Sequence, residues 1–237
     1  MKESIKIELR DLVKRFPMGT KEFTALKGLS FSVMGGEFAG LVGPSGSGKS
    51  TLLNIVGSLD SPSEGSALVL GRDIGRLSHA EAARLRNHHI GFIFQTYNLL
   101  PVYTAYENVE FPLLLLRMGS AERKKAVMEA LEWVGLAEKV KSRPAQMSGG
   151  ECQRVAIARA IVKHPELVLA DEPTANLDAD NSHHILKTMV KINRELGTTF
   201  LFATHDEKVI GYLRRIIRLS DGLLHSDNLV EPINGED

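Results

Sequence analysis

Hydrophobic and polar residues alternate with a period of two in the first part of the chain. The alternation covers residues 5–9 and 29–33, and a pair of glycines follows the second stretch. A short apolar run over residues 38–42 then ends at a glycine-rich loop, after which residues 49–56 place apolar side chains at helical spacing. These patterns predict two strands, a turn and a strand–loop–helix unit, which is the building block of a parallel α/β sheet.

The rest of the pattern predicts a sheet that is interrupted by a helical insert. From residue 97 to about residue 163 the spacing of apolar positions is helical. Thr104 and Glu107 have the spacing of a capping box, and Ser120 is placed to cap a helix over residues 121–134. The other predicted elements are a turn at 62–65, strands over 67–70, 90–94, 167–170 and 199–203, and a helix over 79–87 capped by Ser78.

Composition and charge narrow the function classes. The chain carries 29 basic and 29 acidic side chains, so its bulk charge gives no reason to expect binding to nucleic acid. Its single cysteine excludes an internal disulfide bond and favours a reducing compartment. The N-terminal segment lacks the apolar core of a secretory signal, and no apolar run approaches the about 20 residues of a spanning helix. We expect a protein that does not cross a membrane but can bind one that does.

Residues 43–50 read Gly-Pro-Ser-Gly-Ser-Gly-Lys-Ser, which matches the phosphate-binding pattern G-x-x-x-x-G-K-[ST]. Glycines allow backbone N–H groups to turn inward around an anion, and the following helix directs its positive end to the same place. Lys49 supplies a charge for the β- and γ-phosphates, and the Ser50 hydroxyl suits Mg²⁺. The alternative is a chance match on a flexible loop, which the preceding strand and the following helix disfavour.

Polar residues follow two further predicted strands. Asp171 and Glu172 end the apolar run 167–170, where ligands bind in parallel sheets. Asp171 can hold Mg²⁺, and Glu172 can act as a general base toward water. The alternative is that the pair only caps the next element. His205 follows the strand over 199–203 and can reach a γ-phosphate, although a surface histidine at a helix start is the simpler interpretation of that residue alone.

A second glycine-rich helix start lies at residues 148–151, which read Ser-Gly-Gly-Glu. Ser148 and Glu151 have capping-box spacing, so an ordinary helix start is one interpretation. Two consecutive glycines weaken a helix but permit close approach of the backbone to an anion. This pattern predicts a second phosphate site, and one nucleotide seldom needs two in one subunit. The second site is best explained by a nucleotide that another copy of the chain holds.

With these motifs in this order, the chain resembles the ATP-binding cassette family, the ATPase subunits of ABC transporters, over essentially its whole length. Residues 43–50 match the Walker A loop, residues 167–171 match Walker B, and residues 175–178 match the D-loop. Gln95 matches the Q-loop glutamine. Residues 148–151 match the family signature, which most often ends in Gln rather than Glu.

The resemblance implies a role for each matching residue. It implies that Glu172, His205 and Gln95 are catalytic. It implies that Ser50, Gln95 and Asp171 bind Mg²⁺. Phe16 matches the aromatic residue that stacks on adenine, where the family often has Tyr. The residues implied in binding ATP are Phe16, Gly43, Pro44, Ser45, Gly46, Ser47, Gly48, Lys49, Ser50, Thr51, Ser148, Gly149, Gly150, Glu151 and Asp178.

The resemblance also implies a fold class, which is α/β: a P-loop NTPase with a RecA-like parallel core sheet, an antiparallel β subdomain and an α-helical insert. Residues 1–94 and 165–237 are expected to form the nucleotide-binding core, with the antiparallel part at the N-terminus. Residues 95–164 are expected to form the helical subdomain that carries the signature. In the family, two cassettes pair head to tail with two ATP molecules between them.

The implied function is ATP hydrolysis that powers integral membrane transporter subunits. These subunits are expected to dock near residues 95–118, with the chain peripheral on the cytoplasmic face of the inner (plasma) membrane and with no nucleic acid as partner. Residues 98–101, 104–108, 112–116 and 170–178 resemble the group of lipoprotein-releasing and macrolide-exporting ATPases. That group also includes a cell-division ATPase and peptide-antibiotic exporters.

Other functions remain open at this point. Within the family, the alternatives are the ATPase of another ABC exporter or of an importer. Outside transport, the first alternative is a soluble cassette acting on nucleic acid or ribosomes, although such proteins usually carry a second cassette or a long coiled-coil insertion. The second is a small-molecule kinase, which would need a phosphoacceptor pocket in place of the glycine-rich segment at residues 148–150.

Overall fold

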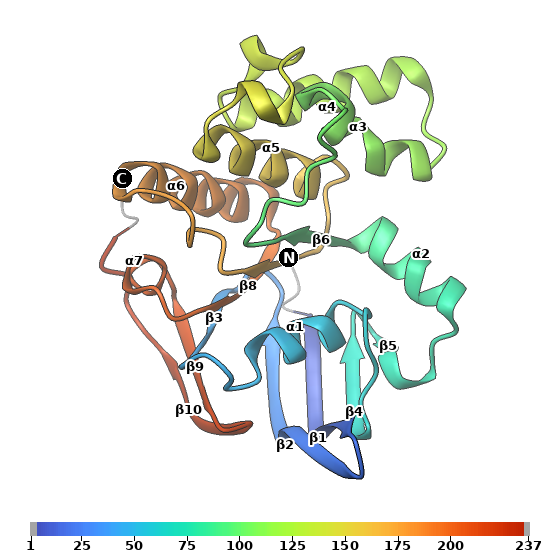
Figure 1. Ribbon diagram of the computed structural model, residues 1–237, viewed down its shortest axis with the longest axis vertical. Helices are drawn as coiled ribbons and strands as arrows, with labels where there is room; N and C mark the ends of the chain where they lie inside the picture. The colour runs from blue at the N-terminus through green and yellow to red at the C-terminus, as the bar shows by residue number, and fades with distance from the viewer. Residues whose placement is uncertain (1–3, 235–237) are drawn as a thin grey trace.

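The computed structural model describes residues 4–234, which form two β-sheets and a helical region beside them (Figure 1). Among these residues, the larger sheet has six strands in the order β10-β9-β3-β8-β7-β6. β9, β3, β8, β7 and β6 are parallel, and β10 pairs antiparallel with β9. The strands are β3 (Phe38–Val42), β6 (Ile90–Ile93), β7 (Leu167–Asp171), β8 (Thr199–Thr204), β9 (Arg215–Ser220) and β10 (Leu223–Leu229).

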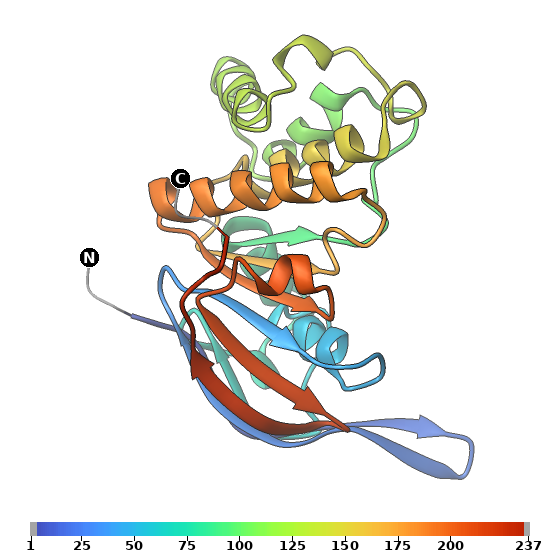
Figure 2. The same ribbon diagram turned by 90° about the vertical axis from the view of Figure 1, so that its left-hand side faces the viewer.

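The smaller sheet has four strands within the described part of the chain, in the order β2-β1-β4-β5, and every pair is antiparallel. β1 and β2 form a long hairpin whose tip extends beyond the rest of the sheet (Figure 2). The strands are β1 (Ile5–Met18), β2 (Lys21–Met34), β4 (Glu64–Val69) and β5 (Arg72–Asp73). The parallel core sheet, the antiparallel sheet and the helical insert are the three parts predicted from the sequence.

The helices lie in different parts of the molecule. α3, α4 and α5 gather at one end of the molecule, whereas α1 lies close to the smaller sheet (Figure 1). No helix within residues 4–234 is both long and apolar enough to cross a membrane. The α-helices are α1 (Lys49–Val56), α2 (His79–His89), α3 (Ala105–Leu115), α4 (Ser120–Trp133), α5 (Gly149–Ile161), α6 (Ala179–Leu196) and α7 (Glu207–Ile210), and the 3₁₀ turns are η1 (Ile74–Arg76), η2 (Ala137–Lys139) and η3 (Pro144–Gln146).

Side chains of the six-stranded sheet alternate between two hydrophobic cores, because successive residues of a strand point to opposite faces. Phe38, Phe200 and Phe202 belong to the core shared with α3, α4, α5 and α6. Leu41 and Leu201 belong to the core shared with α1 and the smaller sheet. The strands that lead to the predicted site are therefore packed on both faces. This packing holds the ends of the strands, and the residues that follow them, in place.

The predicted elements around the glycine-rich loop are confirmed. β3 and α1 have the predicted bounds, and β7 and β8 each extend one residue further than predicted. Ser78 and Thr104 both form the predicted N-caps, each as part of a capping box. The predicted cap at Ser120 is wrong. Gly119 has the extended backbone of an N-cap, so α4 begins with Ser120 itself, and no side chain caps it.

The segments that form α6, β9 and β10 carry no element predicted from the sequence. β9 shows no alternation of apolar and polar residues because two consecutive residues of the strand, Ile216 and Ile217, are both buried, one toward each core. Strands covered on both faces lose the period of two. The turn between β9 and β10 could have been recognised from the sequence, because Asp-Gly is typical of a hairpin turn. In the structure Asp221 and Gly222 both have the positive φ that such a turn requires.

Candidate nucleotide site

A cavity of about 430 Å³ lies at the carboxyl ends of β7 and β8, beside the loop that joins β3 to α1. This end of a parallel sheet is the usual ligand-binding edge. All but two of its lining residues were selected from the sequence, the exceptions being Phe23 and Ala25. The lining residues are Phe23, Ala25, Ser45, Gly46, Gly48, Lys49, Ser50, Thr51, Gln95, Asp171, Glu172 and His205.

The loop between β3 and α1 needs glycine at two positions. Gly48 has a φ of 98°, and a Cβ there would lie 2.9 Å from the carbonyl oxygen of Ala25. A Cβ on Gly43 would lie 2.0 Å from the carbonyl oxygen of Leu219. α1 begins at Lys49, so the free N–H groups of its first turn face the same loop. The backbone here forms a cradle for an anion.

Opposite charges meet at this cradle. Lys49 Nζ donates to the carbonyl oxygen of Gly43 at 2.7 Å, and Ser50 Oγ donates to Asp171 Oδ1 at 3.1 Å. Burial lowers the pKa of Lys49, and the carboxylates of Glu172 and Asp171 raise it in part. Burial raises the pKa of Asp171, the hydrogen bond from Ser50 lowers it in part, and the neighbouring Glu172 raises it further. The site therefore favours a ligand that stabilises both the Lys49 ammonium and the Asp171 carboxylate.

Glu172 and His205 lie together although they follow different strands. Adjacent parallel strands β7 and β8 bring the two residues to one edge of the sheet. Glu172 Oε1 lies 2.6 Å from His205 Nδ1, and Glu172 Oε2 accepts from Thr204 Oγ1 at 3.1 Å. Glu172 has a φ of 45°, in the left-handed region that a glutamate rarely adopts. The Glu172 side chain is oriented by two partners at the cavity wall, rather than capping the next helix.

The second glycine-rich segment starts α5 as a complete capping box. The Ser148 hydroxyl accepts from the Glu151 N–H at 3.2 Å, and the Glu151 carboxylate accepts from the Ser148 N–H at 2.8 Å. Glu151 also forms an ion pair with Lys139 at 3.4 Å. The negative charge of Glu151, which stands where the family most often has Gln, is therefore stabilised by Ser148 and Lys139.

The signature segment does not reach the phosphate loop within one copy of the chain. Of the residues that the structure describes, none in the segment 148–151 lines the cavity. Asp178, predicted from the D-loop match, caps α6 by accepting from the Asn181 N–H at 2.9 Å and does not line the cavity either. The residues expected to bind ATP thus fall into two separate groups.

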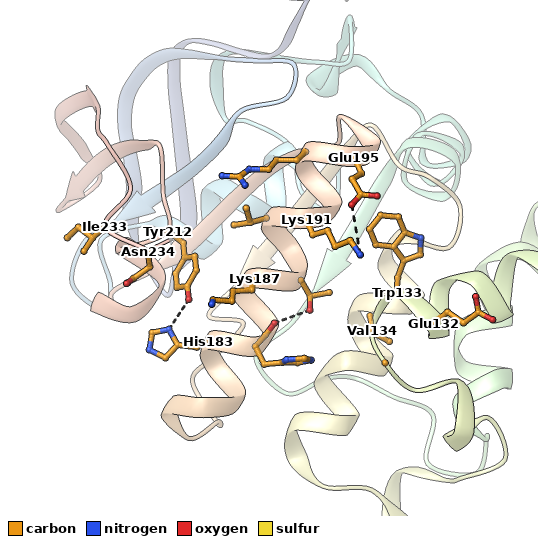
Figure 3. A pocket seen from close by; sticks show the side chains of 15 residues that line it. Glu132, Trp133, Val134, His183, Lys187, Lys191, Glu195, Tyr212, Ile233 and Asn234 are labelled. Atoms are coloured by element: carbon orange, nitrogen blue, oxygen red, sulfur yellow. Dashed lines mark hydrogen bonds and ion pairs between the residues drawn. The ribbon is translucent and has the colours of Figure 1, made fainter. Parts of the chain in front are cut away.

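A larger cavity of about 1010 Å³ lies between the end of α4, the length of α6 and the segment around residue 233 (Figure 3). Lys191 forms an ion pair with Glu195 at 3.9 Å there, and its ammonium lies 5.0 Å from the Trp133 ring. Among the described residues that line it, none was selected from the sequence. Its size therefore does not make it the candidate site, because the residues predicted to carry the chemistry line the smaller cavity.

A family model described as ABC transporter matches residues 26–175, which contain the phosphate loop, the signature segment and the Asp171–Glu172 pair. The chain belongs to the ABC transporter family. The cassette is an ATP-hydrolysing subunit of that family, and the predicted fold class and enzyme class are confirmed.

Curated relatives agree with this assignment. The chain is 46% identical to the lipoprotein-releasing system ATP-binding protein LolD of Geobacter metallireducens over 93% of its length and 98% of that protein. It is 44% identical to the macrolide export ATP-binding/permease protein MacB of Burkholderia thailandensis over 98% of its length. The chain spans only 35% of that longer relative.

Solved structures of ABC cassettes have the same fold. The ATP-binding cassette MJ0796, in a dimeric post-hydrolysis state bound to ADP and phosphate, superposes with a TM-score of 0.87 at 40% identity, covering 97% of this chain and 99% of that one. CbiO1 from Clostridium perfringens, part of the ABC transporter complex cbiONQ, superposes with a TM-score of 0.86 at 29% identity, covering 96% of this chain and 89% of that one.

Phe23 of this ABC cassette lines the cavity but was not predicted from the sequence. Phe16 pairs with Phe23 across the β1–β2 hairpin, and both side chains are exposed, by 37% and 53%. Phe23 lines the cavity, whereas Phe16 does not, and the Lys14 ammonium lies 5.0 Å from the Phe16 ring. Directly paired residues of an antiparallel hairpin share a face of the sheet. The exposed aromatic residue opposite Phe16 was the available signal.

The cassette also requires glycine at position 150 for packing within one chain. A Cβ there would lie 2.6 Å from Asn181 Oδ1, and Asn181 Nδ2 is held by Asp178 Oδ2 at 2.7 Å. We expect Gly150→Ala to lower the free energy of unfolding by about 1–3 kcal/mol, because the crowded side chains must shift. Urea denaturation measures this change. Gly75→Ala is the control, since a Cβ there would meet only ordinary contacts of 3.4–3.8 Å, and equal midpoints for the two variants would contradict the prediction.

Proposed function

We propose that this cassette hydrolyses ATP with Mg²⁺ in composite sites between two copies, and that closure and reopening of the pair drive an integral membrane partner. The observation that carries the proposal is the division of the nucleotide residues into two groups. The phosphate loop, Asp171, Glu172 and His205 share one cavity, whereas residues 148–151 lie outside it. A head-to-tail pair of copies brings the second group of one chain to the cavity of the other.

The donor set at the phosphate loop fits a magnesium nucleotide. Ser50 and Asp171 supply hydroxyl and carboxylate oxygens that already lie 3.1 Å apart, and Gln95 adds an amide oxygen on the same cavity. Oxygen ligands of this kind are the ones that Mg²⁺ prefers. A bound Mg²⁺ would neutralise developing charge on the phosphates. Burial raises the pKa of Asp171, and a bound cation would lower it again by stabilising the carboxylate. This effect supports the assignment of Asp171 to Mg²⁺.

The remaining residues divide the chemistry among themselves. Lys49 and the N–H groups of the cradle bind and orient the phosphates. Glu172 accepts a proton from the attacking water, and His205 steadies the γ-phosphate. The 2.6 Å contact between Glu172 and His205 supports a joint role, because each fixes the orientation of the other.

The partner surface is proposed to lie near residues 95–118, in a helical subdomain of residues 95–164 that is inserted into a core of residues 1–94 and 165–237. Apolar side chains in this region stay exposed: Leu100 by 38%, Val102 by 70% and Leu115 by 59%. An exposed apolar patch favours a protein partner. We place the cassette at the cytoplasmic face of the inner membrane, bound to that partner.

The names of the relatives favour lipoprotein release or export as the process that is driven. The test is a pull-down of the tagged Glu172→Gln chain from detergent-solubilised membranes with ATP and Mg²⁺. We expect an integral membrane protein, and one with few spans and a large extracytoplasmic domain would support the lipoprotein-release or export group. Recovery of ribosomes or nucleic acid without a membrane protein, from a folded and ATP-bound sample, would favour a soluble cassette instead.

The aromatic pair on the hairpin yields a further prediction. If Phe16 and Phe23 contact the adenine base, Phe23→Ala and Phe16→Ala each weaken ATP binding about 5- to 150-fold, since one stacked base contributes about 1–3 kcal/mol. Binding of inorganic tripolyphosphate, which has no base, stays unchanged in both. Titration calorimetry measures both ligands. Phe111→Ala removes a similarly exposed ring on α3 and serves as the control. Parallel losses for both ligands would mean that the hairpin acts on the phosphates.

A further inference from the structure

Gln153 is a fully buried polar side chain on α5, the helix that begins with the signature segment. Its amide Nε2 donates to the carbonyl oxygen of Pro173 at 2.7 Å. Its Oε1 is buried as well and has no hydrogen-bond partner among residues 4–234. Within this described part of the chain, the hydrogen bond of the Gln153 side chain therefore leads away from its own helix to the turn that follows β7.

Packing of α5 alone does not explain a glutamine at this position. The buried positions that follow it on the helix carry apolar side chains, among them Val155, Ala156 and Ile157. A buried polar atom without a partner, such as Gln153 Oε1, lowers the stability of the folded chain. What the amide contributes is its hydrogen bond to the Pro173 carbonyl, so the benefit of Gln153 lies in the turn that it holds.

This turn carries Glu172, the residue immediately before Pro173. Glu172 has a φ of 45°, and such rarely adopted backbone conformations persist only where surrounding contacts impose them. On one side, the Glu172 N–H donates to the carbonyl oxygen of Ala203 on β8 at 2.9 Å. On the other side, the proline ring fixes φ of residue 173, so a hydrogen bond to the Pro173 carbonyl also orients the peptide that joins it to Glu172. Gln153 thus supplies one of the contacts that hold the Glu172 backbone.

The helix that supplies this contact serves a different nucleotide from the residue that it holds. Under the proposed function, the start of α5 at Ser148 faces the nucleotide of the other copy, whereas Glu172 lines the cavity of its own chain. Gln153 itself does not line that cavity. An effect of Gln153 on Glu172 can therefore be separated from an effect on the signature segment by choosing which copy of a pair carries the substitution.

We propose that Gln153 is a positioning residue for Glu172 of its own chain, holding the turn at Pro173 so that the Glu172 carboxylate meets the attacking water. The inference rests on the proposed function, because it takes Glu172 as the base of a site shared by two copies. It assigns a task in hydrolysis to a buried residue of the signature helix that lies outside the nucleotide cavity.

Gln153→Met keeps the length of the side chain and removes its amide. We expect the turnover number of the full chain to fall about 10- to 100-fold, since a displacement of about 1 Å at a reacting group can have an effect of that size. The affinity for ATP, measured by titration calorimetry, stays within about twofold of the wild-type value. A loss of affinity that matches the loss of turnover would contradict a positioning role. Unfolding of the variant at the assay temperature would contradict it too, because the amide would then be required by the fold.

Mixed pairs decide which copy Gln153 serves. A pair of one Lys49→Ala chain and one Ser148→Asp chain has a single complete site, whose base comes from the Ser148→Asp chain and whose signature comes from the Lys49→Ala chain. Gln153→Met is added to one chain or to the other, so that both mixtures contain the same substitutions. We expect the loss of about 10- to 100-fold only when Gln153→Met lies on the chain that supplies the base. The other mixture should match the rate of the parent pair.

The outcomes distinguish this inference from the proposed function. If the parent mixture forms mixed dimers but recovers no activity, the shared sites of the proposed function fail, and this inference fails with them. If the parent mixture is active, a loss that follows the chain supplying the signature would mean that Gln153 supports residues 148–151 instead. An equal loss in both mixtures would indicate a general packing role, and no loss in either would make Glu172 independent of Gln153. Each of these three results overturns this inference alone.

Discussion

Glu172→Gln is expected to bind ATP but to hydrolyse it about 10²- to 10⁴-fold more slowly than the wild-type cassette, and to accumulate as an ATP-bound dimer. An amide cannot take a proton from water, and a general base contributes an acceleration of about this size. The substitution keeps the side chain's length and one acceptor oxygen, so Thr204 and His205 retain a partner. Phosphate release measures turnover, and size-exclusion chromatography with ATP measures the dimer.

Glu207→Gln is the matched control for this prediction. Glu207 is an exposed carboxylate in the first turn of α7, two positions after His205, and it does not line the nucleotide cavity. We expect it to turn over at the wild-type rate. Undiminished hydrolysis in Glu172→Gln would remove Glu172 from the role of base, whereas equal losses in both variants would indicate a general effect of charge near β8.

Ser148→Asp should abolish hydrolysis, whereas Ser148→Asn should retain most of it. Both replacements are good N-cap residues, so both preserve the start of α5. Asp adds a negative charge where the partner's γ-phosphate is proposed to lie, and like charges repel strongly in a site that excludes water. The measurement is the ATPase rate at saturating ATP, with helix stability checked by thermal unfolding. Equal rates for the two variants would mean that Ser148 does not face a nucleotide.

Mixing variants makes this second prediction specific to a composite site. Lys49→Ala removes the phosphate-binding charge, and Ser148→Asp disables the signature, so neither variant alone should be active. A mixed pair contains one site in which an intact phosphate loop meets an intact signature. We therefore expect ATPase activity to return in the mixture. In each mixed pair, about half of the sites, one of the two, are competent. No recovery in a mixture shown to form mixed dimers would contradict the two-copy site.

The residues around the phosphate loop could be predicted from the sequence because their backbone requirements are local. Gly43 and Gly48 are the glycines whose missing Cβ atoms allow close approach of Leu219 and Ala25. The end of the apolar run at Asp171 likewise locates a strand terminus without any knowledge of its neighbours. The same reasoning placed Glu172 at the cavity, and the hydrogen bond to His205 follows from the adjacency of β7 and β8.

The features that could not be predicted depend on contacts between distant segments. The location of Phe23 at the cavity depends on the register of the β1–β2 hairpin, which brings residue 23 opposite residue 16. The packing of Gly150 against Asn181 joins the starts of α5 and α6, and no local pattern reports it. β9 was missed because burial on both faces removed the alternation on which strand prediction relies.

The position of α1 between the two sheets has a mechanical consequence. Leu52, Ile55 and Val56 share one core with side chains from both sheets, so any tilt of α1 would disrupt packing on two sides at once. Under the proposed function, the phosphate end of the nucleotide would therefore bind next to a helix that is packed on two sides. We expect any displacement that follows ATP binding or release to occur elsewhere, and β6 is the expected hinge because, in the described sheet, it pairs only with β7. A membrane subunit bound next to β6 would be displaced by a rotation of the helical region relative to α1 and the phosphate loop, which stay fixed.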